Sequence, residues 1–202
     1  PTSHTGIKTK SNPHGITDSP FIPTKLALGA GATFIARVPD TNPKGMQAVF
    51  LAAENHRGAS LVEILQNCII FNDKTFGDVT GKDVKHDMQI HLEHGKPMVY
   101  GKESDKGIIL NGLKLEAVTI GENGITEEDL LVHDAHEDDI SLHMMIANMN
   151  APEFPVAMGV IREVKALTFD EGMKLQLEEN IKTTKFKNSD DLFNSGDTWE
   201  VQ

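Results

Sequence analysis

The segment ATFIARVPDTNPKGMQAVFLAAENHRGASLVEIL, residues 32–65, contains the pattern that decides the fold. Its first part, residues 32–38, is apolar and β-branched, which is typical of a buried strand. A helix should follow, because Asn42 can cap it and Pro43 suits its first position. Residues 59–65 are a second apolar run and predict a second strand. A strand, a helix and a strand with short connections predict a β-α-β unit with parallel strands and a right-handed crossover.

The chain's only cysteine, Cys68, follows the second predicted strand in the segment LVEILQNCIIFND. Ligands of parallel α/β sheets gather at the carboxyl ends of the strands, so the thiol is expected where a site would form. A cysteine after a core strand is most often a small buried residue. The polar neighbours Gln66, Asn67 and Asn72 favour an accessible setting instead. A metal at Cys68 would need further ligands from elsewhere, because this chain has no second thiolate.

Turn-forming residues divide the rest of the chain into short elements. Pro23 suits the start of a short helix, and Gly29 and Gly31 suit its end. The two apolar runs joined by Asn111-Gly112 predict a hairpin with a type I′ turn. Three later elements are expected, namely a helix within 138–149, a strand within 153–164, and a helix opened by a capping box from Thr168 to Glu171.

Composition limits the classes of protein to which the chain can belong. Its 202 residues are 39% hydrophobic and suit one sizeable domain, or a domain with an appendage. The net charge of −11 argues against binding to nucleic acid or to an anionic membrane. No run approaches the roughly 20 apolar residues of a membrane span. The lone cysteine excludes an internal disulfide and, with the polar start of the chain, predicts a cytoplasmic location.

Two histidine-containing segments have a metal-binding and a plain interpretation. In VHDAHEDD, His133 and His136 could share a helical face and a metal, whereas acidic residues before an apolar run equally predict a solvated helix entry. In HLEHGK, His91 and Glu93 would share one face of a strand. We favour the helix entry in the first segment and a polar sheet edge in the second.

Several segments together resemble a known family. They occur in the order PTS, PFIPTKLALGAGATFIAR, HRGASLVEILQNCIIFND, HLEHGKP, LLVHDAHEDD and PEFPVAMGV. As an ordered set they resemble the thiamine-diphosphate-binding beta subunit of 2-oxoacid:ferredoxin oxidoreductases, most closely the 2-oxoglutarate type. The resemblance covers nearly the whole chain and is densest in its first 75 residues. It implies an α/β fold, with residues 1–75 as the C-terminal part of a thiamine-diphosphate-binding parallel-sheet domain. Residues 76–202 would then be a C-terminal extension with a hairpin, helices and a tail.

The resemblance assigns roles to few residues. Cys68 matches the fourth thiolate of the family's [4Fe-4S] cluster. Thr2 and Ser3 match the end of the active-site loop, as neighbours of the thiamine diphosphate rather than as catalytic residues. Lys8 and Lys10 follow this loop and could meet an anionic substrate or be simply solvated.

The family's magnesium and diphosphate motifs, and its other three cluster cysteines, lie before the position that matches Pro1. The resemblance therefore implies that this chain alone is inactive. Two parallel strands also do not make a covered core, so we expect some exposed apolar surface.

The function implied by the resemblance is the oxidative decarboxylation of 2-oxoglutarate with coenzyme A to succinyl-CoA and CO2, with electrons passing to ferredoxin. Thiamine diphosphate, Mg2+ and a [4Fe-4S] cluster would be the cofactors, and an alpha subunit of the same enzyme the partner. Three alternatives stay open at this point. They are a beta subunit acting on pyruvate or branched-chain 2-oxoacids, a non-catalytic binding or assembly module of the same ancestry, and an independent hydrolase or metal-binding protein built on VHDAHEDD.

Overall fold

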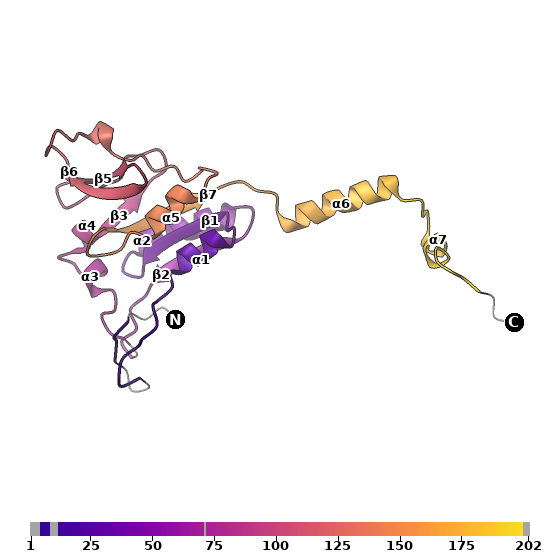
Figure 1. Ribbon diagram of the computed structural model, residues 1–202, viewed down its shortest axis with the longest axis horizontal. Coiled ribbons are helices and arrows are strands. Elements are labelled where there is room, and N and C mark those ends of the chain that lie inside the picture. The colour runs from indigo at the N-terminus through magenta and orange to yellow at the C-terminus, as the bar shows by residue number, and fades with distance from the viewer. Residues whose placement is uncertain (1–4, 9–11, 71, 200–202) are drawn as a thin grey trace. The chain divides into compact units, whose positions relative to one another are not determined.

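The computed structural model describes residues 5–8, 12–70 and 72–199. The chain forms two compact units, Pro1–Ala166 and Leu167–Gln202. Figure 1 labels the elements of both units, and both sheets belong to the first one.

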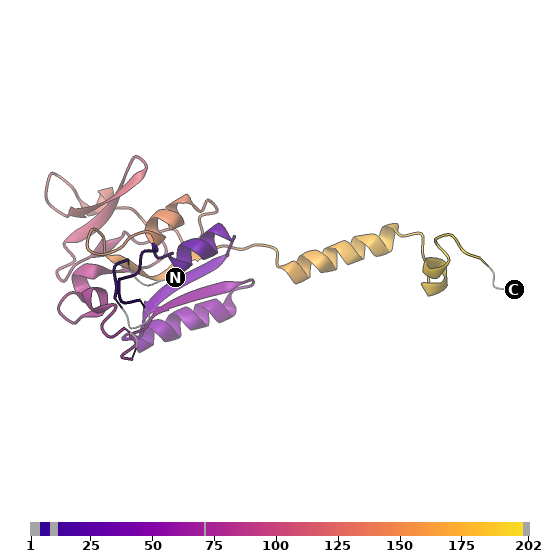
Figure 2. The same ribbon diagram turned by 60° about the horizontal axis from the view of Figure 1, so that its bottom comes forward.

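A four-stranded sheet organises the first unit. Its strands lie in the order β2 (Ser60–Leu65), β1 (Phe34–Pro39), β7 (Val156–Glu163) and β3 (Gln89–Leu92). β1 and β2 are parallel, which confirms the predicted β-α-β unit, and Figure 2 shows the two strands with the helix α2 beside them. β7 runs antiparallel to β1 and parallel to β3, so the α/β fold is confirmed and its sheet is mixed.

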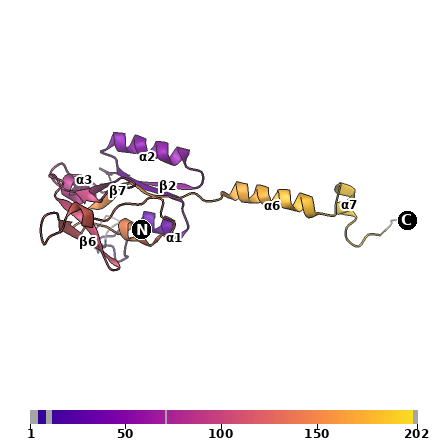
Figure 3. The same cartoon turned by 90° about the horizontal axis from the view of Figure 1, so that it is seen from above.

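Helices cover both faces of this sheet. The helix α2 (Pro43–Asn55) begins as predicted, because the Asn42 side chain accepts a hydrogen bond from the Gly45 amide at 3.0 Å. α1 (Pro23–Gly29) lies on the opposite face from α2, as Figure 3 shows, and packs beside α5 (Ser141–Ala147). β1 lies between β2 and β7 in the sheet, and with helices on both faces it is buried along its whole length.

Side chains of β1 alternate between two cores, as the period of two in a strand requires. Ile35 joins the cluster of α1, α5 and β3, which includes Leu28, Ile90 and Ile146. Phe34, Ala36 and Val38 point to the other face and pack against Val49 of α2. Because both faces are buried, the strand is apolar on both faces apart from Arg37, rather than alternating between apolar and polar residues.

A second sheet is antiparallel and contains β4 (Val99–Tyr100), β5 (Lys106–Asn111) and β6 (Lys114–Thr119). The predicted hairpin is confirmed, but the predicted turn type is wrong. Asn111 pairs with Lys114, so the central residues of the turn are Gly112 and Leu113. Gly112 has φ +61°, while Leu113 is absent from the described residues with positive φ. Positive φ at the first central position alone, where glycine is favoured, is the pattern of a type II′ turn.

Three short helices lie between β2 and α5 in the described part of the chain. They are α3 (Gly77–Thr80), α4 (Lys85–Met88) and the 3-10 helix η1 (Glu127–Asp129). β3 also arises here, with Gln89, Ile90 and Leu92 buried and His91 facing outward. Because β3 and β7 add two strands to the sheet, the first unit extends well past residue 75. The division of the family's domain at residue 75 stays a prediction.

Apolar side chains stay exposed on the first unit, as expected. Leu26, Phe50, Leu51 and Ile64 belong to α1, α2 and the edge strand β2. In the second unit, α6 (Phe169–Thr183) carries the predicted capping box, and α7 is Ser189–Phe193. Among the residues that the structure describes, no helix is long and apolar enough to cross a membrane.

Candidate functional site

Cys68 lies in an exposed turn just beyond the carboxyl end of β2. The Asn72 amide donates to the Cys68 carbonyl at 2.9 Å and closes the turn. Ile69 and Ile70 are 78% and 81% exposed, so this turn presents a thiol and two large apolar side chains to solvent. The structure thus agrees with the accessible setting that the polar neighbours predict.

Asn67 fixes the turn through its backbone and its side chain. Its amide donates to Oδ2 of Asp40 at 3.0 Å, and Asp40 directly follows β1. Its side-chain nitrogen donates to Oδ1 of Asp73 at 2.9 Å, and its side-chain oxygen accepts from the Lys74 amide at 2.7 Å. These three bonds tie the ends of β1 and β2 to both sides of the turn that carries Cys68.

A surface thiol held in this way can serve as one corner of a shared metal cluster. The sequence contains a single cysteine, so this chain supplies one thiolate and the remaining three of a [4Fe-4S] cluster would have to come from elsewhere. Within residues 5–8, 12–70 and 72–199 there is no group of three His, Cys, Asp or Glu side chains that could hold a metal. The residues present therefore fit one corner of a cluster and no complete site.

The structure supports neither of the two hypotheses that a histidine-containing segment binds a metal. The segment with His133 and His136 is a loop before α5, so the two rings do not share a helical face. His133 is fully buried, and its Nε2 lies 2.9 Å from the Val160 carbonyl oxygen. In the other segment β3 ends at Leu92, so Glu93 lies outside the strand and does not share a face with His91.

Arg162 explains the fold of the acidic loop before α5. From β7, its guanidinium donates to the carbonyl oxygens of Glu137 at 2.6 Å and Asp138 at 3.0 Å. It also lies 2.9 Å from Nδ1 of the buried His143, whose Nε2 lies 2.9 Å from the Asp134 carbonyl oxygen. Because Arg162 can only donate, this Nδ1 accepts and the imidazole is neutral. Burial also lowers the pKa of His143. The helix-entry interpretation is thus favoured, with a buried anchor that the sequence did not predict.

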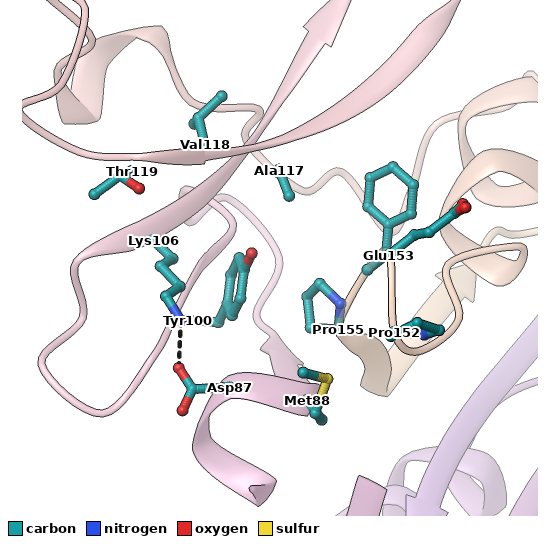
Figure 4. Close-up of a pocket in the computed structure, with 11 residues that line it drawn as sticks. Asp87, Met88, Tyr100, Lys106, Ala117, Val118, Thr119, Pro152, Glu153 and Pro155 are labelled. Carbon is teal, nitrogen blue, oxygen red and sulfur yellow. Dashed lines mark hydrogen bonds and ion pairs between the residues drawn. The ribbon is translucent and has the colours of Figure 1, made fainter. Parts of the chain in front are cut away.

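A cavity of about 260 Å³ lies between the hairpin, α4 and the loop before β7 (Figure 4). Lys106 and Asp87 both line it and contact each other, with Nζ and Oδ1 2.6 Å apart. The hydrogen bond to Asp87 raises the pKa of Lys106, and burial raises the pKa of Tyr100. Because the Lys106 ammonium and the Asp87 carboxylate already neutralise each other, we interpret them as a structural ion pair that links β5 to α4.

The remaining predicted residues lie at the start of the chain. Thr2, Ser3 and Lys10 are outside the described residues. Lys8 is described and exposed. Lys8 lines neither of the two cavities described here.

Comparisons with known proteins identify relatives of the whole chain. The 2-oxoglutarate oxidoreductase subunit KorB of Mycobacterium tuberculosis is 36% identical over 204 residues, which cover 100% of this chain and 54% of the relative. The 2-oxoglutarate synthase subunit KorB of Archaeoglobus fulgidus is 38% identical over 68 residues, or 34% of this chain and 26% of that protein. No family model matches the chain.

A solved structure supports the fold. The 2-oxoglutarate:ferredoxin oxidoreductase from Magnetococcus marinus, with 2-oxoglutarate, coenzyme A and succinyl-CoA bound, matches 98% of this chain and 52% of its own with a TM-score of 0.63. Its sequence identity is 18%, so this match concerns the fold alone. The chain spans about half the length of the first curated relative and of this solved chain. The resemblance seen in the sequence is confirmed: over its whole length the chain is similar to about half of a 2-oxoglutarate oxidoreductase subunit, and over about a third of its length to 2-oxoacid:ferredoxin oxidoreductase beta subunits.

Proposed function

We propose that this chain is a portion of the beta subunit of a 2-oxoglutarate:ferredoxin oxidoreductase. The reaction joins 2-oxoglutarate and coenzyme A into succinyl-CoA and CO2, while two electrons reduce ferredoxin and one proton is released. The observation that carries the proposal is the 36% identity with a 2-oxoglutarate oxidoreductase subunit across the entire chain. The exposed thiol at the carboxyl edge of β1 and β2 supports it, because ligands gather at such edges.

Cys68 would be one thiolate ligand of a [4Fe-4S] cluster, and thiamine diphosphate with Mg2+ would supply the decarboxylation chemistry when bound. This chain's own contribution is to hold the thiol. The Asn67 bonds to Asp40, Asp73 and Lys74 restrict the turn before any cluster binds. Thr2 and Ser3 would lie beside the thiamine diphosphate as loop neighbours.

The partners in this proposal are an alpha subunit of the same enzyme, ferredoxin and the two substrates, in the cytoplasm. The 202 residues by themselves would be inactive, because they provide one of the four thiolates of the cluster. The beta-subunit name of the relatives supports an alpha-type partner.

The test is a ferredoxin-reduction assay on the full-length beta subunit assembled with its alpha subunit. We expect reduction that requires both 2-oxoglutarate and coenzyme A. Pyruvate and a branched-chain 2-oxoacid are the matched alternative substrates. Faster reduction with either of these would replace the 2-oxoglutarate assignment. No reduction with any 2-oxoacid, despite bound thiamine diphosphate and iron, would favour a non-catalytic module.

A second substrate assignment has an observation of its own. The 2-oxoacid:ferredoxin oxidoreductase subunit beta of Saccharolobus solfataricus is 36% identical over 73 residues, which is 36% of this chain. Its name specifies 2-oxoacids in general. The full-chain match to a 2-oxoglutarate enzyme is nearly three times as long, so 2-oxoglutarate is the first substrate to test.

A further inference from the structure

A second cavity, of about 390 Å³, opens at the same edge of the sheet as the Cys68 turn. β1 and β2 end at this edge, and because β7 and β3 run the opposite way, both begin there. The walls of the cavity come from the loop between β1 and α2, from α4, from β3, and from β4 with the turn that follows it. Its volume lies within the range of roughly 300–1,000 Å³ that is usual for small-molecule sites.

The lining of this cavity differs in charge from the rest of the protein. The chain has a net charge of −11 and 30 acidic residues. Yet Lys85, His86 and His91 line the cavity, and none of the described lining residues is Asp or Glu. Four carboxylates adjoin lining residues in the sequence, namely Asp40, Asp87, Glu103 and Asp105, but none of them lines the cavity. Asp40 accepts from the Asn67 amide, and Asp87 lines the other cavity, where it pairs with Lys106. The cavity thus collects basic side chains in an otherwise acidic chain.

These basic groups lie close enough to affect one another. Desolvation lowers the pKa of His91, and the neighbouring His86 and Lys85 lower it further. Repulsion among cations is relieved when an anion binds between them, because each protonated form is then stabilised. The titratable groups that line the cavity are these three and Tyr100, all from α4, β3 and β4.

Neutral hydrogen-bonding groups complete the lining. Thr41, after β1, and Ser104, after β4, bring hydroxyl groups, and Asn42 brings an amide at the start of α2. The positive end of the α2 dipole adds to the field at this wall. A phosphate group offers three or more acceptor oxygens and up to two charges, whereas a carboxylate offers two oxygens and one charge. Donors spread over several walls therefore match a phosphate better than a carboxylate.

We propose that the cavity lined by Lys85, His86 and His91 binds the phosphate group of a small anionic ligand. A single phosphate leaves most of the volume unfilled, so the site has room for a phosphate carried on a larger molecule such as a nucleotide. The site is separate from Cys68 and does not depend on the redox function proposed above.

The test is an NMR titration of the 202-residue chain labelled with 13C at histidine, with inorganic phosphate and with adenosine diphosphate as two separate probes. We expect saturable shifts of the His86 and His91 resonances with at least one probe. Equal affinities for inorganic phosphate and adenosine diphosphate would mean that the cavity recognises the phosphate group alone. Tighter adenosine diphosphate binding would mean that a carried group adds contacts. Both outcomes support the site.

Lys85→Met and His86→Gln should each weaken binding by about tenfold, the effect of losing one charge-assisted hydrogen bond. Both positions are exposed, so the fold should tolerate the substitutions. Lys165→Met and His14→Gln change exposed residues outside the cavity and should bind as wild type does. The proposal is overturned if neither probe shifts these resonances, if both cavity variants keep wild-type affinity, or if succinate binds as tightly as phosphate.

Discussion

Asn67 is the residue on which the Cys68 turn depends most. It makes one backbone and two side-chain hydrogen bonds, to Asp40, Asp73 and Lys74. Lys74 has φ +60°, a conformation that non-glycine residues rarely adopt, and its amide is held by the Asn67 side chain. One amide side chain thus secures both the position of the thiol and an unfavourable backbone conformation.

Replacing Asn67 by alanine should loosen this turn without unfolding the protein. Two exposed side-chain bonds are lost, each worth about 0.5–1.5 kcal/mol. We expect faster amide hydrogen exchange at Lys74 and a small drop in the free energy of unfolding. Asn150→Ala, which removes an exposed amide elsewhere, is the matched control. Unchanged exchange at Lys74 would show that the turn is held by other contacts.

Glu63 balances a buried charge between β1 and β2. Arg37 is directly opposite it in the parallel register, and Nε and Oε2 are 2.6 Å apart. The side chains are 3% and 15% exposed, so removing one partner leaves an uncompensated charge out of water. Glu63→Ala should lower the free energy of unfolding by about 3 kcal/mol.

Urea denaturation measures this effect, with Glu116→Ala on the exposed hairpin as the control. The double variant Arg37→Met with Glu63→Leu should recover most of the loss, because well-packed apolar pairs replace buried ion pairs at little cost. A Glu63→Ala effect no larger than that of the control would mean that water or another group solvates Arg37.

At the scale of elements, the sequence predicted those helices and strands that depend on interactions between residues close together in the chain. Asn42, Pro43 and the apolar runs around them act within a few residues, and β1, α2 and β2 formed as predicted. Strand character was predicted in HLEHGK, but the bounds of β3 were wrong, because this strand has four residues and takes its stability from pairing with β7, far along the chain. The hairpin was found, but its turn type depended on a one-residue register that Asn111-Gly112 alone does not fix.

The capping box of α6 gives a test at this scale. Thr168 Oγ1 accepts from the Glu171 amide at 3.2 Å, and the Glu171 carboxylate accepts from the Thr168 amide at 3.1 Å. Thr168→Ala should destabilise the helix by about 1 kcal/mol and fray its first turn. Carbon-13 chemical shifts of residues 169–172 report this directly. Thr183→Ala at the other end of α6 should leave the first turn intact.

For the whole molecule, buried histidines make stability depend on pH. Burial is the main cause that lowers the pKa of His133 and His143 from the ordinary value of 6.5. The unfolded chain therefore binds more protons than the folded one below this value, so the free energy of unfolding falls as the pH drops through 6.5 toward the lowered pKa values. Above 6.5 the contribution is fully present.

Urea denaturation at about pH 7.5 and about pH 5.5, on either side of the ordinary histidine pKa, checks this direction. The protein should be less stable at the lower pH. His133→Asn keeps a side-chain donor for the Val160 carbonyl and removes one titrating ring, so its pH dependence should be smaller. Equal stability at both pH values would mean that the two imidazoles bind protons in the folded state.

The candidate site was predictable only in part, for reasons of distance along the chain. The sequence placed Cys68 beyond a parallel strand in a polar setting, because strand order and neighbouring residues are local. It did not connect Asn67 to Asp40, which are 27 positions apart, or His143 to Arg162, which are 19 apart. The basic cavity likewise joins α4 and β3 to the loop after β1, which no local pattern indicates.

The central claim is that Cys68 is a thiolate ligand of an iron–sulfur cluster in the assembled enzyme. The measurement is iron content, with the electron paramagnetic resonance spectrum of the reduced cluster, for the full-length subunit with its partner as wild type and as Cys68→Ala. Asn150→Ala, an exposed substitution away from the turn that keeps the thiol, is the matched control. Cys68→Ala should lose the [4Fe-4S] signal and most of the iron, while the control should keep both. A full cluster in Cys68→Ala would contradict the claim.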